Sequence, residues 1–121
     1  MKYLSIFSLS LLMFWACTDD SKEDLGGNGN NCDTENVSFA SDVQVIFNAS
    51  CTFSVCHDAS TPSAGINLTS YEGIDAVSTT LLLNAIKHEG NADPMPRGAA
   101  KLSDCKIATI EAWINDGKPN N

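Results

Sequence analysis

Two thiols and an imidazole fall within seven residues of this chain, at Cys51, Cys56 and His57. The usual signature for covalent haem attachment is C-x-x-C-H, in which both thiols bond one porphyrin edge and the adjacent imidazole reaches the iron. Here the spacer has four residues, 52–55, so two of them must bulge outward if both sulfurs are to reach one edge. Short Cys/His segments also bind zinc, and two nearby cysteines can form a disulfide. The segment alone leaves these three interpretations open.

Residues 1–16 resemble a secretory signal peptide, with a positive start at Lys2 and an uncharged apolar stretch after it. The stretch is shorter than the roughly 20 apolar residues of a membrane span. Ala16 followed by Cys17 resembles a bacterial lipobox, which implies cleavage before Cys17 and lipid on that residue. The alternative is ordinary cleavage near Ala16. The lipobox interpretation predicts an exported protein, anchored to a membrane by lipid and facing the periplasm or the cell surface.

Residues 17–35 are expected to form a flexible tether, because an acidic run is followed by a Gly/Asn-rich run with little to bury. The acidic run resembles the export signal of some Bacteroidetes surface lipoproteins, and a solvated spacer is the alternative. After residue 16 the chain has six Lys and Arg against fifteen Asp and Glu. This charge argues against a nucleic-acid partner, because phosphate binding needs a basic face. A protein partner with a basic docking face suits it better.

Residues 36–121 are expected to form one domain. A domain of this size usually needs covalent cross-links or a bound cofactor for stability. The five cysteines have three separate uses: lipidation for Cys17, the 51–57 segment for Cys51 and Cys56, and the two ends of the folded part for Cys32 and Cys105. If the last two pair, export permits the disulfide. The division fits haem attachment, and it also fits a disulfide between Cys51 and Cys56.

Apolar periodicity predicts an amphipathic helix at each end of the domain. Residues 36–50 carry an apolar stripe at helical spacing and would deliver Cys51 at the end of the helix. The valine-rich content of this segment also allows a strand. Residues 103–116 form the second such segment, with Ser103 as its N-cap and Gly117 just after its end.

Shorter helices are predicted between these two. Thr69 and Glu72 have the spacing of a capping box with Thr69 as N-cap, so a helix should follow to about residue 77. Residues 81–86 form another helical segment that ends near His88. The β-branched residues between the two segments predict a bend or a break.

Met95 stands between Pro94 and Pro96, in a stretch without apolar periodicity, residues 89–100. Prolines on both sides stiffen the backbone and fix where one side chain points. The alternative is a methionine that fills a gap in the core.

Together these features resemble the class I cytochrome c family, and most closely the small cytochrome-c-like domains of exported bacterial lipoproteins. The resemblance covers residues 37–120, and these parts carry it: Cys51, Cys56 and His57, residues 67–71, residues 93–96, residues 101–103 and residues 110–114. It implies an all-α fold of three to five helices around one covalently bound haem c. It also implies that Cys51 and Cys56 carry the haem thioethers, that His57 is the proximal iron ligand and that Met95 is the distal one. The four-residue spacer departs from the family's pattern.

An iron with both axial positions filled moves one electron and has no open site for a substrate, so the chain is expected to be an electron carrier and not an enzyme. Its expected partners are redox proteins. His88 is the competing distal ligand, and an open distal site for a gas or peroxide is a further option. The alternative function is a disulfide- or zinc-stabilised lipoprotein domain with a binding or structural role. Four zinc ligands are available for it: Cys51, Cys56, His57 and His88.

Overall fold

The computed structural model describes residues 32–121, which fold into helices and loops without a strand in that range. Its α-helices are α1 (Gln44–Ser50), α2 (Tyr71–Asp75), α3 (Thr79–Lys87) and α4 (Asp104–Asn115). A π-helical turn, η1 (Phe39–Val43), leads into α1, and a 3-10 turn, η2 (Ser63–Gly65), lies in the loop after it. The all-α class expected from the sequence is therefore confirmed for these residues.

Residues 1–31 lie outside the described part of the chain. The expected signal peptide, the lipidation site at Cys17 and most of the expected tether therefore stay predictions. Within residues 32–121, none of the helices has the length and apolar character needed to cross a membrane.

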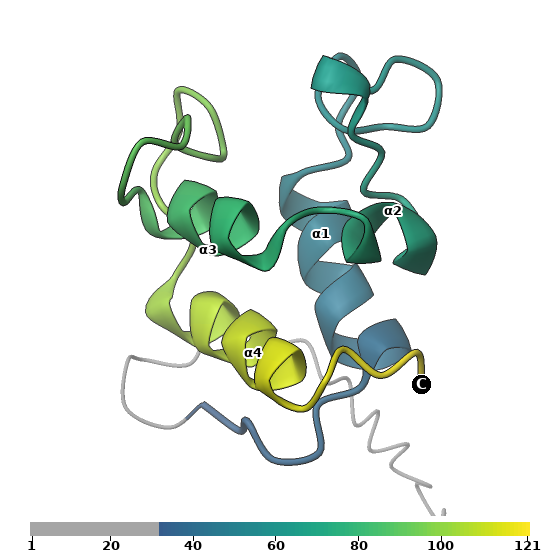
Figure 1. Ribbon diagram of the computed structural model, residues 1–121, viewed down its shortest axis with the longest axis vertical. Helices are drawn as coiled ribbons and strands as arrows, with labels where there is room; N and C mark the ends of the chain where they lie inside the picture. The colour runs from purple at the N-terminus through teal and green to yellow at the C-terminus, as the bar shows by residue number, and fades with distance from the viewer. Residues whose placement is uncertain (1–31) are drawn as a thin grey trace, which may run out of the picture.

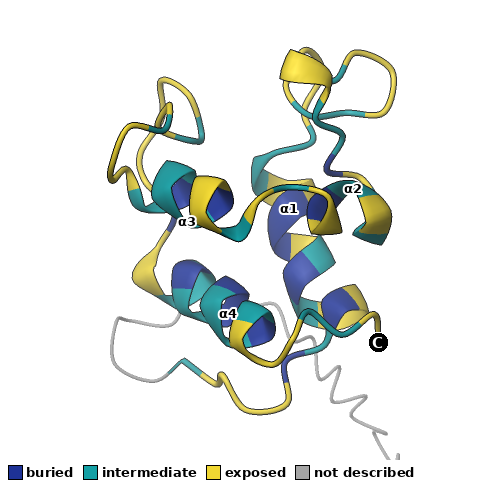
Figure 2. Ribbon diagram, viewed as in Figure 1, coloured by how far each residue is buried: buried dark blue, intermediate teal, exposed yellow. Residues whose placement is uncertain are grey.

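The helices form two groups, with α1 and α2 on one side of the molecule and α3 and α4 on the other (Figure 1). Helix α4 packs against both η1 and α3, which joins the groups. The buried faces of the helices turn toward one another (Figure 2). Two long loops, residues 52–66 and 88–100, extend to the same end of the molecule (Figure 1).

The core is built from the apolar stripes of these helices. The stripe expected at the start of the domain is buried throughout: Phe39, Val43, Ile46 and Phe47. Trp113 of α4 is fully buried at 0% exposure, and its ring centroid lies 5.6 Å from that of Phe39. Its Nε1–H donates to the Pro119 carbonyl oxygen at 2.9 Å. Burying an indole usually requires such a partner. Trp113 therefore packs in the core beside the rings of Phe39 and Tyr71.

The helix ends show which capping predictions are correct. Ser103 caps α4, because its Oγ accepts from the Lys106 N–H at 3.4 Å, and Gly117 follows with φ +89°. The prediction that Thr69 caps α2 is wrong. Ser70 is the N-cap, and its Oγ accepts from the Gly73 N–H at 3.3 Å.

Thr69 does not cap α2, because its backbone N–H and its hydroxyl are hydrogen-bonded to the side chain of Asn67. The Thr69 N–H and Oγ1–H both donate to Asn67 Oδ1, at 2.9 and 2.7 Å. Asn side chains commonly bond the backbone two residues on, in competition with a helix start. The helix consequently begins one residue later than the capping box suggested.

Cys32 and Cys105 are joined in a disulfide, with Cα atoms 5.4 Å apart at a sequence separation of 73. Cys105 lies in the first turn of α4, so the bond ties the start of the described chain to that helix. This is the pairing that the division of the cysteines suggested.

Candidate functional site

The four-residue spacer forms a compact turn directly after α1. Cys51 caps the helix, and its N–H donates to the Phe47 carbonyl oxygen at 2.8 Å. The chain then returns, and the His57 N–H donates to the Cys51 carbonyl oxygen at 3.1 Å. Inside the turn, the Cys56 N–H donates to the Phe53 carbonyl oxygen at 2.9 Å. The spacer therefore brings the backbones of Cys51 and His57 together in spite of its length.

The extra residues of the spacer are largely exposed, and the side chains of Phe53 and Val55 line the open part of the larger cavity described below. Phe53 is 58% exposed and Val55 is 77% exposed, which are high values for large apolar side chains. Val55 adopts φ +63°, a region that β-branched residues rarely enter. Its N–H lies 3.4 Å from Thr61 Oγ1, in the loop that follows.

Asp58 organises that loop. Its carboxylate accepts hydrogen bonds from the Ser60 hydroxyl and from both the N–H and the hydroxyl of Thr61, at 2.8 to 2.9 Å. These bonds to Ser60 and Thr61 stabilise the charged form and hold the pKa of Asp58 below its usual value. Thr61 thus connects Asp58 to the spacer turn.

The imidazole of His57 is oriented by a backbone acceptor. Its Nδ1 lies 2.9 Å from the Ile66 carbonyl oxygen, and the Leu68 N–H donates back to the His57 carbonyl oxygen at 3.0 Å. An Nδ1–H donor leaves the lone pair on Nε2. Metal-ligating histidines are usually fixed in this way by a second bond to a carbonyl or carboxylate.

Met95 is held against the end of α3. Its N–H donates to the Ala85 carbonyl oxygen at 2.9 Å, and its own carbonyl oxygen lies 3.1 Å from Nε2 of His88. The Met95 side chain lines the space between the long loops, whereas His88 is exposed and lines neither cavity there. Of the two expected distal ligands, the structure therefore brings Met95 and not His88 to the site.

Two adjoining cavities occupy the end of the molecule where the long loops meet. The larger has a volume of about 520 Å³ and the smaller about 210 Å³. Five residues line both cavities: Cys51, His57, Ser63, Met95 and Arg97. The smaller cavity is otherwise mostly apolar, with walls from α1 and α3 that include Phe47, Leu82 and Ile86. Small-molecule and cofactor sites typically have this size and this mixture of apolar walls and few polar groups.

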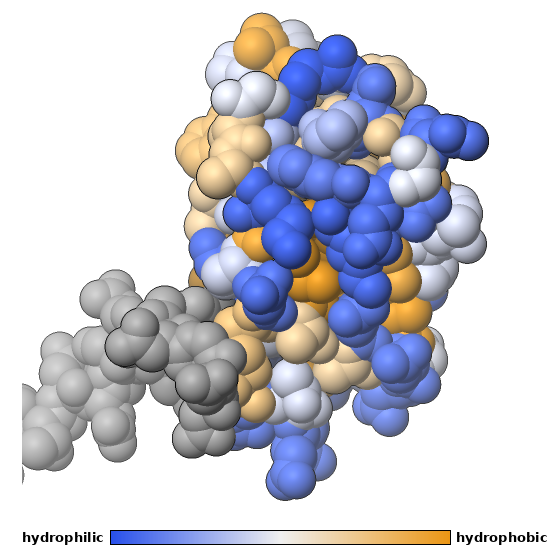
Figure 3. Space-filling view, turned by 90° about the vertical axis from the view of Figure 1, so that its left-hand side faces the viewer, coloured by the Kyte–Doolittle hydropathy of each residue, from blue (hydrophilic) through white to orange (hydrophobic). Residues whose placement is uncertain are grey.

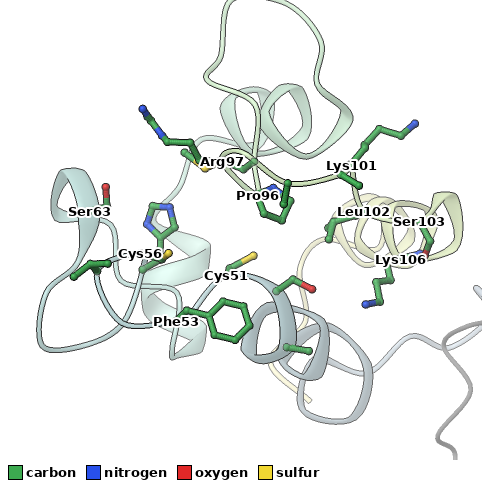
Figure 4. A pocket seen from close by; sticks show the side chains of 17 residues that line it. Cys51, Phe53, Cys56, Ser63, Pro96, Arg97, Lys101, Leu102, Ser103 and Lys106 are labelled. Atoms are coloured by element: carbon green, nitrogen blue, oxygen red, sulfur yellow. The ribbon is translucent and has the colours of Figure 1, made fainter.

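Cys51 and Cys56 are both free thiols in this structure, so the alternative in which they form a disulfide is not what it shows. Both line the larger cavity, and their sulfur atoms face the space between the spacer and the loop of Pro96 (Figure 4). Burial raises the pKa of the Cys51 thiol to about 11, and the nearby Cys56 adds to the effect. Cys56 is exposed.

Three cationic residues lie at the mouth of the larger cavity, although the described chain is acidic, and two of the three are paired with carboxylates. Arg97, Lys101 and Lys106 line it, and no Asp or Glu among the described residues does so. Arg97 pairs with Asp93 at 2.6 Å and Lys101 with Asp104 at 3.1 Å. The guanidinium of Arg97 and the ammonium of Lys101 extend away from the cavity (Figure 4). Apolar surface is visible between hydrophilic side chains on the face over α3 and α4 (Figure 3).

The four residues suggested as zinc ligands do not form one cluster. Among residues 32–121, no group of three or more Cys, His, Asp or Glu side chains is placed to hold a metal ion. His88 faces the Met95 backbone.

Sequence reasoning missed two contributors to the site. The acceptor for His57 is the backbone carbonyl of Ile66, and a carbonyl carries no signal in its side chain. Lys106 lies in the first turn of α4, and its distance from the cavity depends on how α4 packs. A hydrogen-bond partner for His57 was the one feature that could have been sought, because a liganding imidazole needs one.

Comparison of this chain with protein-family models, curated proteins and solved structures finds no significant match.

Proposed function

We propose that this chain is a c-type haem protein that transfers single electrons, with His57 and Met95 as axial ligands of the iron. The observation that carries the proposal is the lining shared by the two cavities. Cys51 and His57 come from the turn after α1 and Met95 from the loop after α3, and all three line both cavities. These are a thiol, an imidazole and a thioether, the donors that covalent haem attachment and His/Met ligation require.

Each residue has a defined task in this proposal. Cys51 and Cys56 would carry the thioether bonds at the edge formed by the spacer turn. His57 would bind through Nε2, since Nδ1 faces the Ile66 carbonyl oxygen. When bound, haem would supply an iron that changes oxidation state by one electron, and a thioether ligand would raise its potential. The proposed role is therefore that of a carrier and not of an enzyme.

The apolar residues that line the smaller cavity would affect the redox potential of a bound haem. Phe47, Leu82 and Ile86 are buried and would exclude water from the side of the smaller cavity. A hydrophobic shell around a metal site controls solvent access and hence the redox potential. The exposed Cys56 leaves the spacer edge close to solvent, where a partner can approach.

The charge of the mouth changes the partner that we propose. The composition of the whole chain suggested a redox partner with a basic docking face. At the mouth, however, Arg97 and Lys101 are paired with aspartates, while Lys106 makes no salt bridge among the described residues and lies beside the exposed side chain of Phe53 in the cavity lining. Electrostatic complementarity acts locally at the docking patch. The proposed partner is therefore a redox protein that presents acidic side chains around an apolar centre. The lipid anchor at Cys17 remains part of the proposal, on the sequence pattern alone.

The experiment that tests the proposal compares two substitutions in haem-loaded protein. Met95→Ala is expected to lower the midpoint potential and to remove the sulfur-to-iron charge-transfer band of the ferric protein. Val45→Ala, at an exposed position on α1 that lines neither cavity, is the control and should change neither. A band that survives Met95→Ala would contradict the distal assignment, and a chain that binds no haem would contradict the whole proposal.

A further inference from the structure

The loop that carries Met95 has few side chains to hold it in place. Residues 88–94 leave α3 and return at Met95, and nearly all of them are exposed. Within this return, Gly90 has a positive φ of +64° and packs against the side chain of Asn84. Apolar packing therefore contributes little to the position of Met95, and its backbone hydrogen bonds become decisive.

Two hydrogen bonds fix the Met95 residue from opposite sides of its own backbone. Its N–H donates to the Ala85 carbonyl oxygen at 2.9 Å, and its carbonyl oxygen lies 3.1 Å from Nε2 of His88. Ala85 and His88 belong to the same end of α3, where the His88 N–H also bonds Ala85 at 3.3 Å. One helix terminus thus holds both polar groups of the Met95 backbone.

The conformation of His88 suits this task. It is the C-cap of α3 with φ +58° and ψ +44°, a left-handed conformation that glycine normally fills at this position. A glycine would end the helix equally well but would offer no donor to the Met95 carbonyl. The imidazole must carry its proton on Nε2 to make this bond, so the same nitrogen is not free to bind a metal.

We infer that His88 is a positioning residue for Met95: its imidazole clamps the Met95 backbone to the end of α3 and so keeps the thioether at the haem site. The inference rests on the proposed function. It assigns His88 a role through Met95 instead of the direct ligation that its place in the sequence suggested.

The test substitutes His88→Gly in the haem-loaded protein. Glycine keeps the left-handed helix end and removes only the imidazole. Asn36→Gly is the matched control, because Asn36 is also exposed with a positive φ, +53°, and lines neither long-loop cavity. Two readouts are measured: amide hydrogen exchange of Met95 in the ferrous protein, and the charge-transfer band of the ferric protein on warming.

For His88→Gly, loss of one hydrogen bond is expected to speed exchange of the Met95 amide about fivefold. The ferric band should also weaken at a lower temperature than in the wild type. The exchange of core amides such as that of Ile110, and both readouts for Asn36→Gly, should stay unchanged. Unchanged Met95 exchange in His88→Gly, or a ferric band that is lost at the same temperature as in the wild type, would overturn the inference. Failure of the proposed function is distinguished by Met95→Ala, which would then leave the band and the potential unaffected.

Discussion

The Nδ1 atom of His57 lies 2.9 Å from the carbonyl oxygen of Ile66, nine residues further along the chain. This contact closes the loop that contains η2, and it sets which ring nitrogen is available to the cavity. Because Ile66 contributes only its backbone, the orientation of His57 depends on the loop conformation and not on a second side chain.

The first prediction concerns the proton that His57 Nδ1 donates to the Ile66 carbonyl oxygen. In the ferrous haem-loaded protein, the Nδ1–H of His57 should exchange slowly with deuterium, because it donates to a carbonyl in the loop. Proton NMR of the ring N–H measures this directly. Rapid exchange, comparable to that of an exposed histidine, would show that the contact to Ile66 is not kept in solution.

The charge of the cavity mouth leads to a second prediction. Reduction of the ferric protein by ferrocyanide, an anion, should slow as ionic strength rises, because the probe meets Lys106, the mouth cation without a salt bridge among the described residues. The net charge of −8 for the whole chain would favour the opposite dependence.

A matched pair of substitutions separates the two explanations. Lys106→Gln removes a mouth cation, and Lys87→Gln removes one that pairs with Glu111 and lines neither cavity. At low ionic strength, Lys106→Gln should lower the ferrocyanide rate by about two- to fivefold and Lys87→Gln much less. Equal effects of both would indicate that only total charge matters.

The thiols give a third prediction, for protein made without haem attachment. Burial raises the Cys51 pKa to about 11, so Cys51 stays protonated at neutral pH. Cys56 is exposed and should be alkylated first by iodoacetamide. Mass mapping of the alkylated peptides, with and without urea, measures how fast Cys51 and Cys56 each react in the folded and the unfolded protein. Equal alkylation rates for both thiols in native buffer would contradict the protection of Cys51 by burial.

The same thiol affects stability. Since the folded state holds the Cys51 proton more tightly, the free energy of unfolding should be unaffected below pH 9 and should fall as pH rises toward 11.

The disulfide supports a fourth prediction, about stability. Replacing Cys32 and Cys105 together by serine frees a loop of 73 residues, which should cost roughly 4 kcal/mol of unfolding free energy. Urea unfolding of the oxidised haem-loaded protein and of the double variant tests this. The spectrum of the haem should not change, because neither cysteine lines the two cavities. A double variant as stable as the wild type would contradict the contribution assigned to the bond.

The helices at the two ends of the domain were predictable because their signals are local. The apolar stripe of η1 and α1 is buried as its spacing indicated, and Ser103 caps α4. The start of α2 was not predictable from the capping box, since Asn67 competes for Thr69. Such competition depends on the loop before the helix, which the box does not describe.

The sequence singles out the proposed donors of the candidate site, but it does not reveal the groups that hold them in place. Sequence spacing singles out Cys51, Cys56 and His57, and the flanking prolines single out Met95. It could not show that His88 would turn toward the Met95 backbone, because that depends on the left-handed end of α3. The cationic mouth was also hidden, since it combines residues from the loop after Met95 with the first turns of α4.

The most direct test of the account is mass spectrometry of protein exported from a host that attaches haem covalently. After denaturation and acid-acetone extraction, the peptide that contains Cys51, Cys56 and His57 should retain the mass of one haem. A pyridine haemochrome spectrum of the same sample then shows whether one or both vinyl groups have reacted. A peptide recovered without haem, with its two thiols free or joined to each other, would contradict the central claim.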